Sequence, residues 1–282
     1  MTKKPKTIQE YLDQSSICQD GRLISPITET HCHLDMLKDI DLEQLQNNLN
    51  KIGISRIITI GTSNKNFNRV QEIQQKFPQT FFTLGTHPHE AKDFKEDDLA
   101  YIRKVAANSN SKLVAVGEIG LDYYYDFSPR EKQIEVFKKY LNLAVELNLP
   151  VVIHTRDADE DMANILAEYA PKMLKKGVVH SFSSGLELGK EAAKLGFFLG
   201  FNGMITFKNA DLVREAVRQT PLNQILVETD SPFLTPHPFR GMQNDPTYIP
   251  LVMEKIAEIK GISLKECMAS VELNASRCFF QK

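Results

Sequence analysis

Short runs of apolar, often β-branched residues alternate along this chain with longer segments in which apolar positions recur every three or four residues. The short runs lie at 27–33, 56–60, 81–85, 113–118, 151–154, 178–180, 197–201 and 225–228. Most of them are nearly continuous, which is typical of parallel strands covered on both faces. We therefore predict eight parallel strands.

The segments between these runs have the spacing of amphipathic helices. Leu42, Leu45, Leu49 and Ile52 mark the first. The clearest lies at 130–147, where Ser128-Pro129 supplies an N-cap and a first-turn proline. The last lies around 251–259, and Gly261 follows its end. A strand–helix alternation repeated eight times predicts an α/β protein that forms a (β/α)₈ TIM barrel rather than an open sheet.

The first 25 residues precede this alternation. They hold a basic tip (Lys3, Lys4, Lys6), a possible short helix around 8–12 and a loop at 19–21. We predict a short N-terminal extension at 1–25 and one barrel domain at 26–282, because no linker-like or charged block interrupts the rest. The extension contains no candidate ligand, so we expect it to be dispensable for catalysis.

Composition and charge restrict the class of protein, its binding partners and its compartment, and they leave the fold prediction unchanged. The 282 residues are 42% hydrophobic and 25% charged, which is ordinary for a globular protein. A net charge of −2 argues against a broad surface for a polyanion, although metals and a few arginines could still hold a phosphate. The chain has no signal-like segment and no apolar run near the roughly 18 residues of a membrane span, so we expect a cytoplasmic protein without membrane contact.

Ionisable residues stand at the ends of several predicted strands, and we expect them to hold metal. They are His31, His33, Glu118, His154, His180 and Asp230. Barrels of this kind carry their active sites at the carboxyl ends of the strands. Residues two apart on a strand share a face, so His31 and His33 point the same way and Cys32 points oppositely as a packing residue. The four cysteines (18, 32, 267 and 278) form no C-x-x-C pair and are expected to be buried free thiols.

The ligand types restrict the metal. Imidazole and carboxylate together suit Zn, Mn, Fe or Co, and Mg is possible where few nitrogens bind. One tetrahedral ion needs fewer ligands than this set offers, so we predict two divalent ions bridged by one carboxylate. Paired ions about 3.5–4 Å apart can activate water and hold the attacking and leaving oxygens.

Further residues are candidates for substrate contact. His89 follows the third strand and could contact a phosphate or a metal-bound water, whereas His87 is expected to be structural. Arg240, in a Pro/Gly-rich loop, and Arg156 are candidate phosphate binders, because a guanidinium fork suits phosphate oxygens. Glu228 lies deeper on the last strand and is expected to orient a ligand.

Seven segments resemble the TatD family of metal-dependent deoxyribonucleases, in the right order from about residue 27 to the end. They are ETHCHLD (29–35), GTHPH (85–89), GEIGLDY (117–123), VIHTRD (152–157), VHSFS (179–183), ETDSPFL (228–234) and PFRGMQNDP (238–246). Two departures are Glu29, where the family commonly has Asp, and HSFSSG, which is one residue longer than HSFSG. Neither touches a proposed ligand.

The resemblance implies a TIM barrel with two divalent ions. It implies that one ion is held by His31, His33 and Asp230, that the other is held by His154 and His180, and that Glu118 bridges them. It also implies hydrolysis of DNA phosphodiester bonds, commonly by an exonuclease that acts from a 3′ end. Asp230 and Glu118 would be the catalytic carboxylates, with Asp230 also accepting a proton.

Two activities stay open at this point. One is a deoxyribonuclease that grips single-strand ends, with Arg240 and one of the three tyrosines at 123–125 holding phosphate and base. The other is a metal-dependent esterase or amidohydrolase, such as a D-aminoacyl-tRNA deacylase, since the same site can attack a carbonyl carbon. We expect a monomer with no obligate protein partner.

Overall fold

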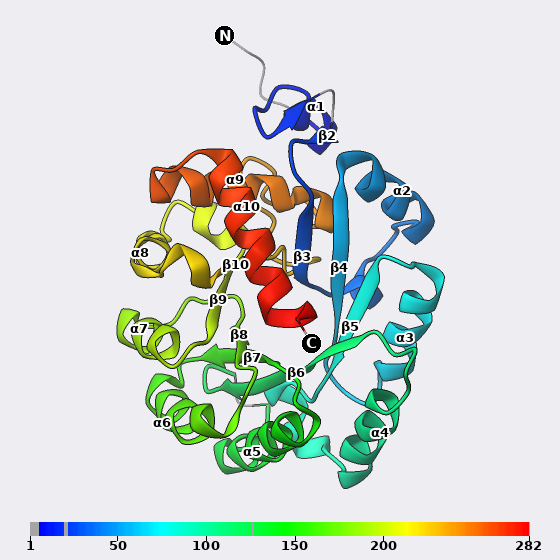
Figure 1. Cartoon of the computed structure of the whole chain (residues 1–282), viewed down its shortest axis with the longest axis vertical. Coiled ribbons are helices and arrows are strands. Elements are labelled where there is room, and N and C mark those ends of the chain that lie inside the picture. The colour runs from blue at the N-terminus through cyan, green and yellow to red at the C-terminus, as the bar shows by residue number, and fades with distance from the viewer. Residues whose placement is uncertain (1–5, 20–21, 126, 282) are drawn as a thin grey trace.

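A computed structural model describes residues 6–19, 22–125 and 127–281. Its barrel strands are β3 (Ile27–Cys32), β4 (Ile54–Gly61), β5 (Thr80–Leu84), β6 (Leu113–Asp122), β7 (Val151–Arg156), β8 (Gly177–Val179), β9 (Phe198–Phe201) and β10 (Ile225–Val227). They form one eight-stranded sheet in which each strand lies beside its sequence neighbour and runs parallel to it. Figure 1 shows this ring of strands inside a ring of helices. The predicted TIM barrel is confirmed.

The outer helices follow the strands in turn. They are α2 (Leu42–Ile52), α3 (Phe67–Lys76), α4 (Glu96–Ala106), α5 (Arg130–Leu147), α6 (Asp159–Tyr169), α7 (Leu186–Lys194), α8 (Asp211–Gln219), α9 (Ile249–Lys260) and α10 (Leu264–Ala275). Helix α9 ends at Gly261 in the left-handed conformation, as predicted. The predicted N-cap of α5 is wrong, because Ser128 donates to the carbonyl of His89 and accepts from the amide of Lys92 instead.

The barrel interior is apolar and is closed at its amino-terminal end by the C-terminal segment. Side chains of the strands, such as Ile58, Val152 and Leu226, form one cluster with Cys278 and Phe279. The last two residues belong to η7, a π-helical turn at Ser276–Phe280 that follows α10. In Figure 1, α10 crosses the ring of strands. The opposite, carboxyl-terminal end of the strands is therefore the open one.

The sheet closes where its first and last strands meet. The amide of Asp230, just after β10, donates to the carbonyl of His31 on β3 over 2.9 Å. The Glu29 carboxylate reinforces this junction by accepting from the amides of His31 (2.9 Å) and Thr229 (3.1 Å). Glu29 is fully buried, and this burial raises its pKa to about 8.

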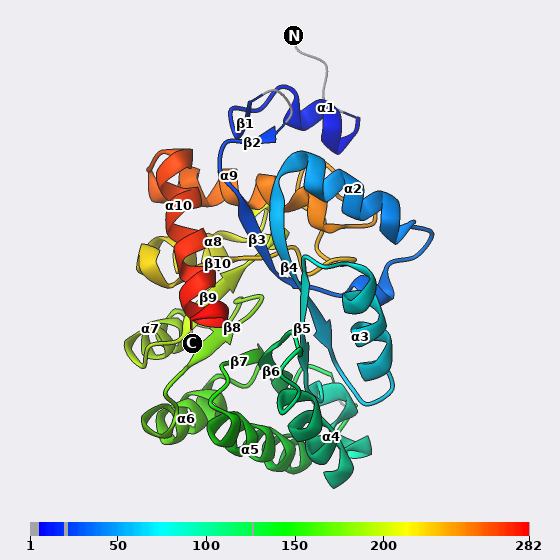
Figure 2. The same cartoon turned by 45° about the vertical axis from the view of Figure 1, so that its right-hand side comes forward.

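The N-terminal extension forms a small unit against the barrel, beyond α2 and α9 in Figure 2. It contains α1 (Ile8–Leu12), which confirms the expected short helix, and an antiparallel pair of β1 (Cys18–Gln19) and β2 (Arg22–Leu23). Lys3, Lys4 and positions 20–21 of the expected loop lie outside the described residues. The domain division at residue 25 stays a prediction. Within the described part of the chain, no helix is long and apolar enough to cross a membrane.

Candidate metal centre

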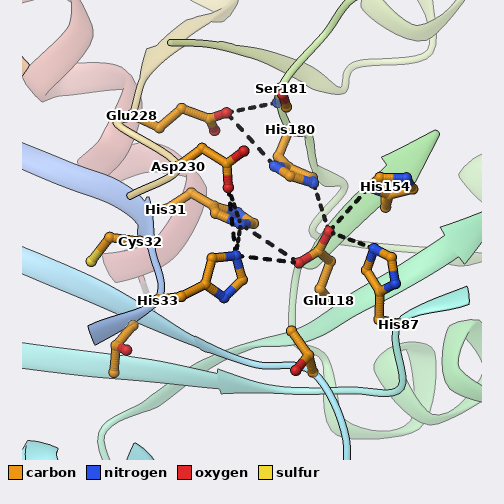
Figure 3. Close-up of polar contacts among 12 residues, drawn as sticks. His31, Cys32, His33, His87, Glu118, His154, His180, Ser181, Glu228 and Asp230 are labelled. Carbon is orange, nitrogen blue, oxygen red and sulfur yellow. Dashed lines mark hydrogen bonds and ion pairs between the residues drawn. The ribbon is translucent and has the colours of Figure 1, made fainter. Parts of the chain in front are cut away.

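The predicted ligands meet at the open end of the barrel, although they come from five different strands. Figure 3 shows them around Glu118, which β6 places at the middle of the group. The group comprises His31, His33, Glu118, His154, His180 and Asp230. Cys32 points away from it, as predicted, and is buried with its Sγ 3.5 Å from the carbonyl of Ile58. All four cysteines are free thiols, but only Cys32, Cys267 and Cys278 are buried as predicted, whereas Cys18 is partly exposed.

One side of the cluster joins two histidines to two carboxylates. The Nε2 atoms of His31 and His33 lie 3.3 Å apart. Oε2 of Glu118 is 3.6 and 3.9 Å from them, and Oδ1 of Asp230 is 3.6 and 3.5 Å from them. Tetrahedral ligands with bonds of about 2.0–2.1 Å to a zinc-like ion are separated by roughly 3.4 Å. These four side chains therefore fit a divalent cation.

The other side of the cluster surrounds the second oxygen of Glu118. Its Oε1 is 2.7 Å from Nε2 of His180, 3.2 Å from Nδ1 of His154 and 3.5 Å from Nε2 of His87. The ring of His180 also stacks on that of His31 at 3.8 Å, so His180 lies between the two sides. Each oxygen of Glu118 thus faces a different group of histidines.

His87 belongs to this cluster, contrary to the expectation that it is structural. It forms a possible metal-holding group with Glu118 and His154. Its Nδ1, however, accepts the backbone amide of His89 over 3.2 Å. A neutral imidazole that accepts at Nδ1 carries its proton on Nε2, so in this tautomer His87 faces the centre as a donor rather than as a ligand.

Asp122 is a residue of the centre that the sequence analysis did not single out. Its Oδ2 lies 3.0 Å from Nε2 of His154 and 2.9 Å from Nε2 of His89. Its Oδ1 accepts the amides of Tyr124 and Tyr125, each over 3.0 Å. Burial alone would raise the pKa of Asp122, but these hydrogen bonds hold the pKa well below its usual value. The ionised carboxylate thereby fixes the His154 ring with Nδ1 toward Glu118.

A glycine explains how β6 reaches Asp122. The predicted strand stopped at Glu118, whereas β6 continues for four more residues, all buried. Gly120 has φ +144°, and a Cβ there would lie only 2.0 Å from the carbonyl oxygen of His154. Glycine therefore permits β6 to run close beside β7. Positions 118, 120 and 122 share one face of the strand, so strand parity could have identified Asp122.

Glu228 is placed as an orienting carboxylate requires. Its Oε1 accepts the amide of Ser181 over 2.7 Å and lies 3.6 Å from Nδ1 of His180. The Nδ2 of Asn202 donates to the same oxygen over 3.2 Å. His180 is thus held between Glu228 on one edge and Glu118 on the other.

The electrostatics of the cluster favour the ionised form of Glu118. Burial alone would raise the pKa of Glu118, but His180, His87 and His154 around it bring that pKa well below the usual value. Burial alone would lower the pKa of His180, but Glu118 raises it well above the usual value. The site therefore concentrates charge on Glu118, at the position where a cation would be shared.

A cleft of about 750 Å³ opens over the cluster. Its walls include Tyr125, Arg156, Phe207 and Phe233. Arg156 lies 3.8 Å above the ring of Tyr124, and the exposed Arg240 lies 3.8 Å above the ring of Phe207. An arginine held flat on a ring keeps its N–H edges available for an anion.

The other tyrosine of the run and His89 are engaged differently. Tyr123 donates its hydroxyl to Asp161 over 2.6 Å and packs beneath Arg130, so this tyrosine is engaged away from the cleft. His89 lines the cleft and contacts Tyr125 and Phe127 edge-on. The Nε2 of His89 is already bonded to Asp122. Contact between His89 and substrate stays a prediction.

Comparison with known proteins agrees with this geometry. Residues 28–280 match the family described as TatD related DNase. The chain belongs to the TatD family. A relative named as an uncharacterized metal-dependent hydrolase, YabD of Bacillus subtilis, is 40% identical over 252 residues, which cover 89% of this chain and 98% of the relative.

Two further TatD relatives extend the comparison. A protein of Erwinia tasmaniensis named 3′-5′ ssDNA/RNA exonuclease TatD is 31% identical over 85% of this chain and 93% of its own. The crystal structure of the TatD homologue YJJV from Escherichia coli superposes with a TM-score of 0.84 at 28% identity, covering 91% of this chain and 98% of that one. The chain is thus a metal-dependent hydrolase of the TatD family, and the enzyme class predicted from its motifs is confirmed.

Proposed function

We propose that this TatD-family hydrolase uses two divalent ions to remove nucleotides from the 3′ end of single-stranded DNA. The observation that carries the proposal is the position of Glu118, whose two oxygens face two separate groups of histidines at the floor of a cleft. The polarity and the substrate are supported by the Erwinia tasmaniensis relative named as a 3′-5′ exonuclease of single-stranded DNA and RNA.

The ligand set suits two ions. His31, His33 and Asp230 would hold one, His154 and His180 would hold the other, and Glu118 would be shared. Such ions supply Lewis acidity and lower the pKa of water. The mixture of nitrogen and oxygen donors fits Zn, Mn, Fe or Co, with Mg also compatible.

The remaining groups of the cleft have separate tasks. Asp230 lines the cleft and would accept the proton of the attacking water. His87, with its proton on Nε2, would donate to an oxygen near Glu118. Arg156 and Arg240 would bind phosphate oxygens through their free edges.

The cleft is better suited to a strand end than to a duplex. A net charge of −2 leaves little basic surface with which to hold a long polyanion. Tyr125 and the half-exposed Phe233 line the cleft beside the cluster, and aromatic rings stack on unpaired bases regardless of sequence. Affinity would then come from contacts with a few nucleotides. A free strand end suits such a site, because its terminal base needs the least energy to unstack.

The test is a comparison of linear and circular single strands. Metal-stripped protein would be incubated with 5′-labelled linear DNA, its duplex and a circle of the same sequence, with Mg, Mn, Zn, Fe or Co added in turn. We expect stepwise shortening of the linear strand from its 3′ end, slower cleavage of the duplex and an intact circle.

Other outcomes would contradict the proposal in different ways. A circle cut as fast as the linear strand would mean an open groove for internal phosphates. Cleavage of a D-aminoacyl-tRNA ester without any cleavage of DNA would mean that the same centre attacks a carbonyl carbon.

Arg240→Ala is expected to weaken strand binding without loss of metal. KM for a single-stranded oligonucleotide should rise about tenfold while kcat changes less, because a phosphate contact outside the cluster contributes to binding. Arg277→Ala is the matched control, since Arg277 is also exposed and lies over a ring, that of Phe198, at the closed end of the barrel. An unchanged KM for the Arg240 variant would remove this arginine from the substrate site.

A further inference from the structure

The N-terminal segment contacts the loop that carries Arg240. Ile8 and Tyr11 pack against a cluster of Phe239, Tyr248 and Leu251. The ring of Tyr11 meets that of Phe239 edge-on, with 6.2 Å between their centroids. Phe239 is 3% exposed, although its neighbour Arg240 is exposed, so the extension covers one side of the loop and leaves the arginine free.

Polar contacts fix the same segment to α9. Tyr11 and Ser15 both donate their hydroxyl groups to the carboxylate of Glu254, one to each oxygen. Leu12 and Ile17 are 1% and 0% exposed and belong to the main core. The segment at 7–17 is therefore anchored to the barrel by both burial and hydrogen bonds, rather than lying loosely on its surface.

The loop at 236–244 connects this anchored segment to the metal centre. At one end Asn244 donates from Nδ2 to the carbonyl of Thr229 over 2.9 Å, directly beside Asp230. In the middle Arg240 rests on Phe207, which lines the cleft. A shift of Phe239 would thus move the neighbouring guanidinium relative to the cleft.

We propose that residues 7–17 form a buttress that fixes the loop at 236–244 and thereby sets the affinity of the cleft for a nucleic-acid strand. Tyr11 is the central positioning residue, because it contacts both Phe239 and Glu254. The match to the TatD family begins only at residue 28, so the buttress lies outside the part that matches the family. Under this proposal the extension contributes to strand binding, and the expectation that it is dispensable for catalysis itself stays a prediction.

The part of the proposal that concerns strand affinity rests on the proposed function, whereas the fixing of the loop does not. The test therefore combines two measurements on the full chain loaded with metal. Amide hydrogen exchange at 239–244 reports on the loop, and KM for a single-stranded oligonucleotide reports on the cleft. Hydrolysis of bis(p-nitrophenyl) phosphate, which carries a single phosphate and no neighbouring nucleotides, reports on the metal centre.

Tyr11→Ala should accelerate amide exchange in the loop about tenfold. It should raise KM for the oligonucleotide about fivefold, leave kcat within about twofold and leave the small substrate unaffected. Tyr11→Phe, which keeps the ring, should give a smaller change of the same kind.

Tyr101→Ala is the matched control. Tyr101 is also half-buried, packs its ring on Phe67 and bonds through its hydroxyl to Asn68, away from the cleft. Its loss should leave both exchange at 239–244 and KM unchanged.

If amide exchange at 239–244 is no faster in Tyr11→Ala than in the Tyr101 control, the buttress is overturned. If exchange is faster but KM is unchanged, the role of the buttress in strand affinity is overturned. If the wild-type protein cleaves no oligonucleotide, the proposed function fails and faster exchange still supports the fixing of the loop.

Discussion

Replacement of Glu118 by alanine is expected to abolish bound metal and activity together. Its two oxygens lie within 3.9 Å of nitrogen atoms from five histidines, so its loss leaves those rings without their shared counter-charge. We expect less than one ion per chain and a fall in kcat/KM of about a thousandfold or more.

Elemental analysis of dialysed protein and steady-state hydrolysis of an oligonucleotide would measure these changes. Glu272→Ala is a suitable control, because Glu272 is a partly buried carboxylate that pairs with Arg56 at the closed end of the barrel. A Glu118 variant that retains two ions per chain would show that the bridge is not at this residue.

Asp122→Asn is expected to have the second largest effect, although Asp122 belongs to neither group around Glu118. The carboxylate accepts two backbone amides at one oxygen and lies between two histidine rings at the other. Asparagine has one acceptor oxygen and an N–H₂ group in place of the other, so it cannot serve both sets of donors. The His154 ring would lose its fixed orientation, and metal affinity should fall about 10- to 100-fold.

Calorimetric titration of the metal-free variant would measure this loss. Asp161→Asn provides the control, because Asp161 is an acceptor for the nearby Tyr123 hydroxyl and touches no histidine of the cluster. Equal metal affinity in the wild type and in the Asp122 variant would contradict this role and would mean that Glu118 alone orients His154.

Some features of the centre were predictable because they depend on strand parity. A strand has a period of two, so the pointing of His31 and His33 into the site and of Cys32 into the core follows from their order. The common location of the predicted ligands follows from the parallel barrel, in which the carboxyl ends of all strands open on one side. These two rules need no knowledge of loops.

Other features depend on contacts between segments that are distant in the sequence, and strand parity alone could not predict them. Asp122 was missed because the predicted strand ended at Glu118, whereas Gly120 allows β6 to continue beside His154. Ser128 had the chemistry of a helix cap but bonds to the loop of His89 instead. The contacts of Tyr11 join residues more than two hundred positions apart, and no local pattern encodes them.

The predicted metal site lies at the junction of β3 and β10, so metal binding should also affect the stability of the barrel. These strands are the two ends of the sheet, joined by the carboxylate of Glu29 and by single bonds such as that from the His33 amide to the carbonyl of Ser231. A cation shared by His31, His33 and Asp230 would grip both ends at once. The free energy of metal binding would then also stabilise the closed barrel. Removal of the metal by a chelator should therefore loosen the barrel first at the junction of β3 and β10.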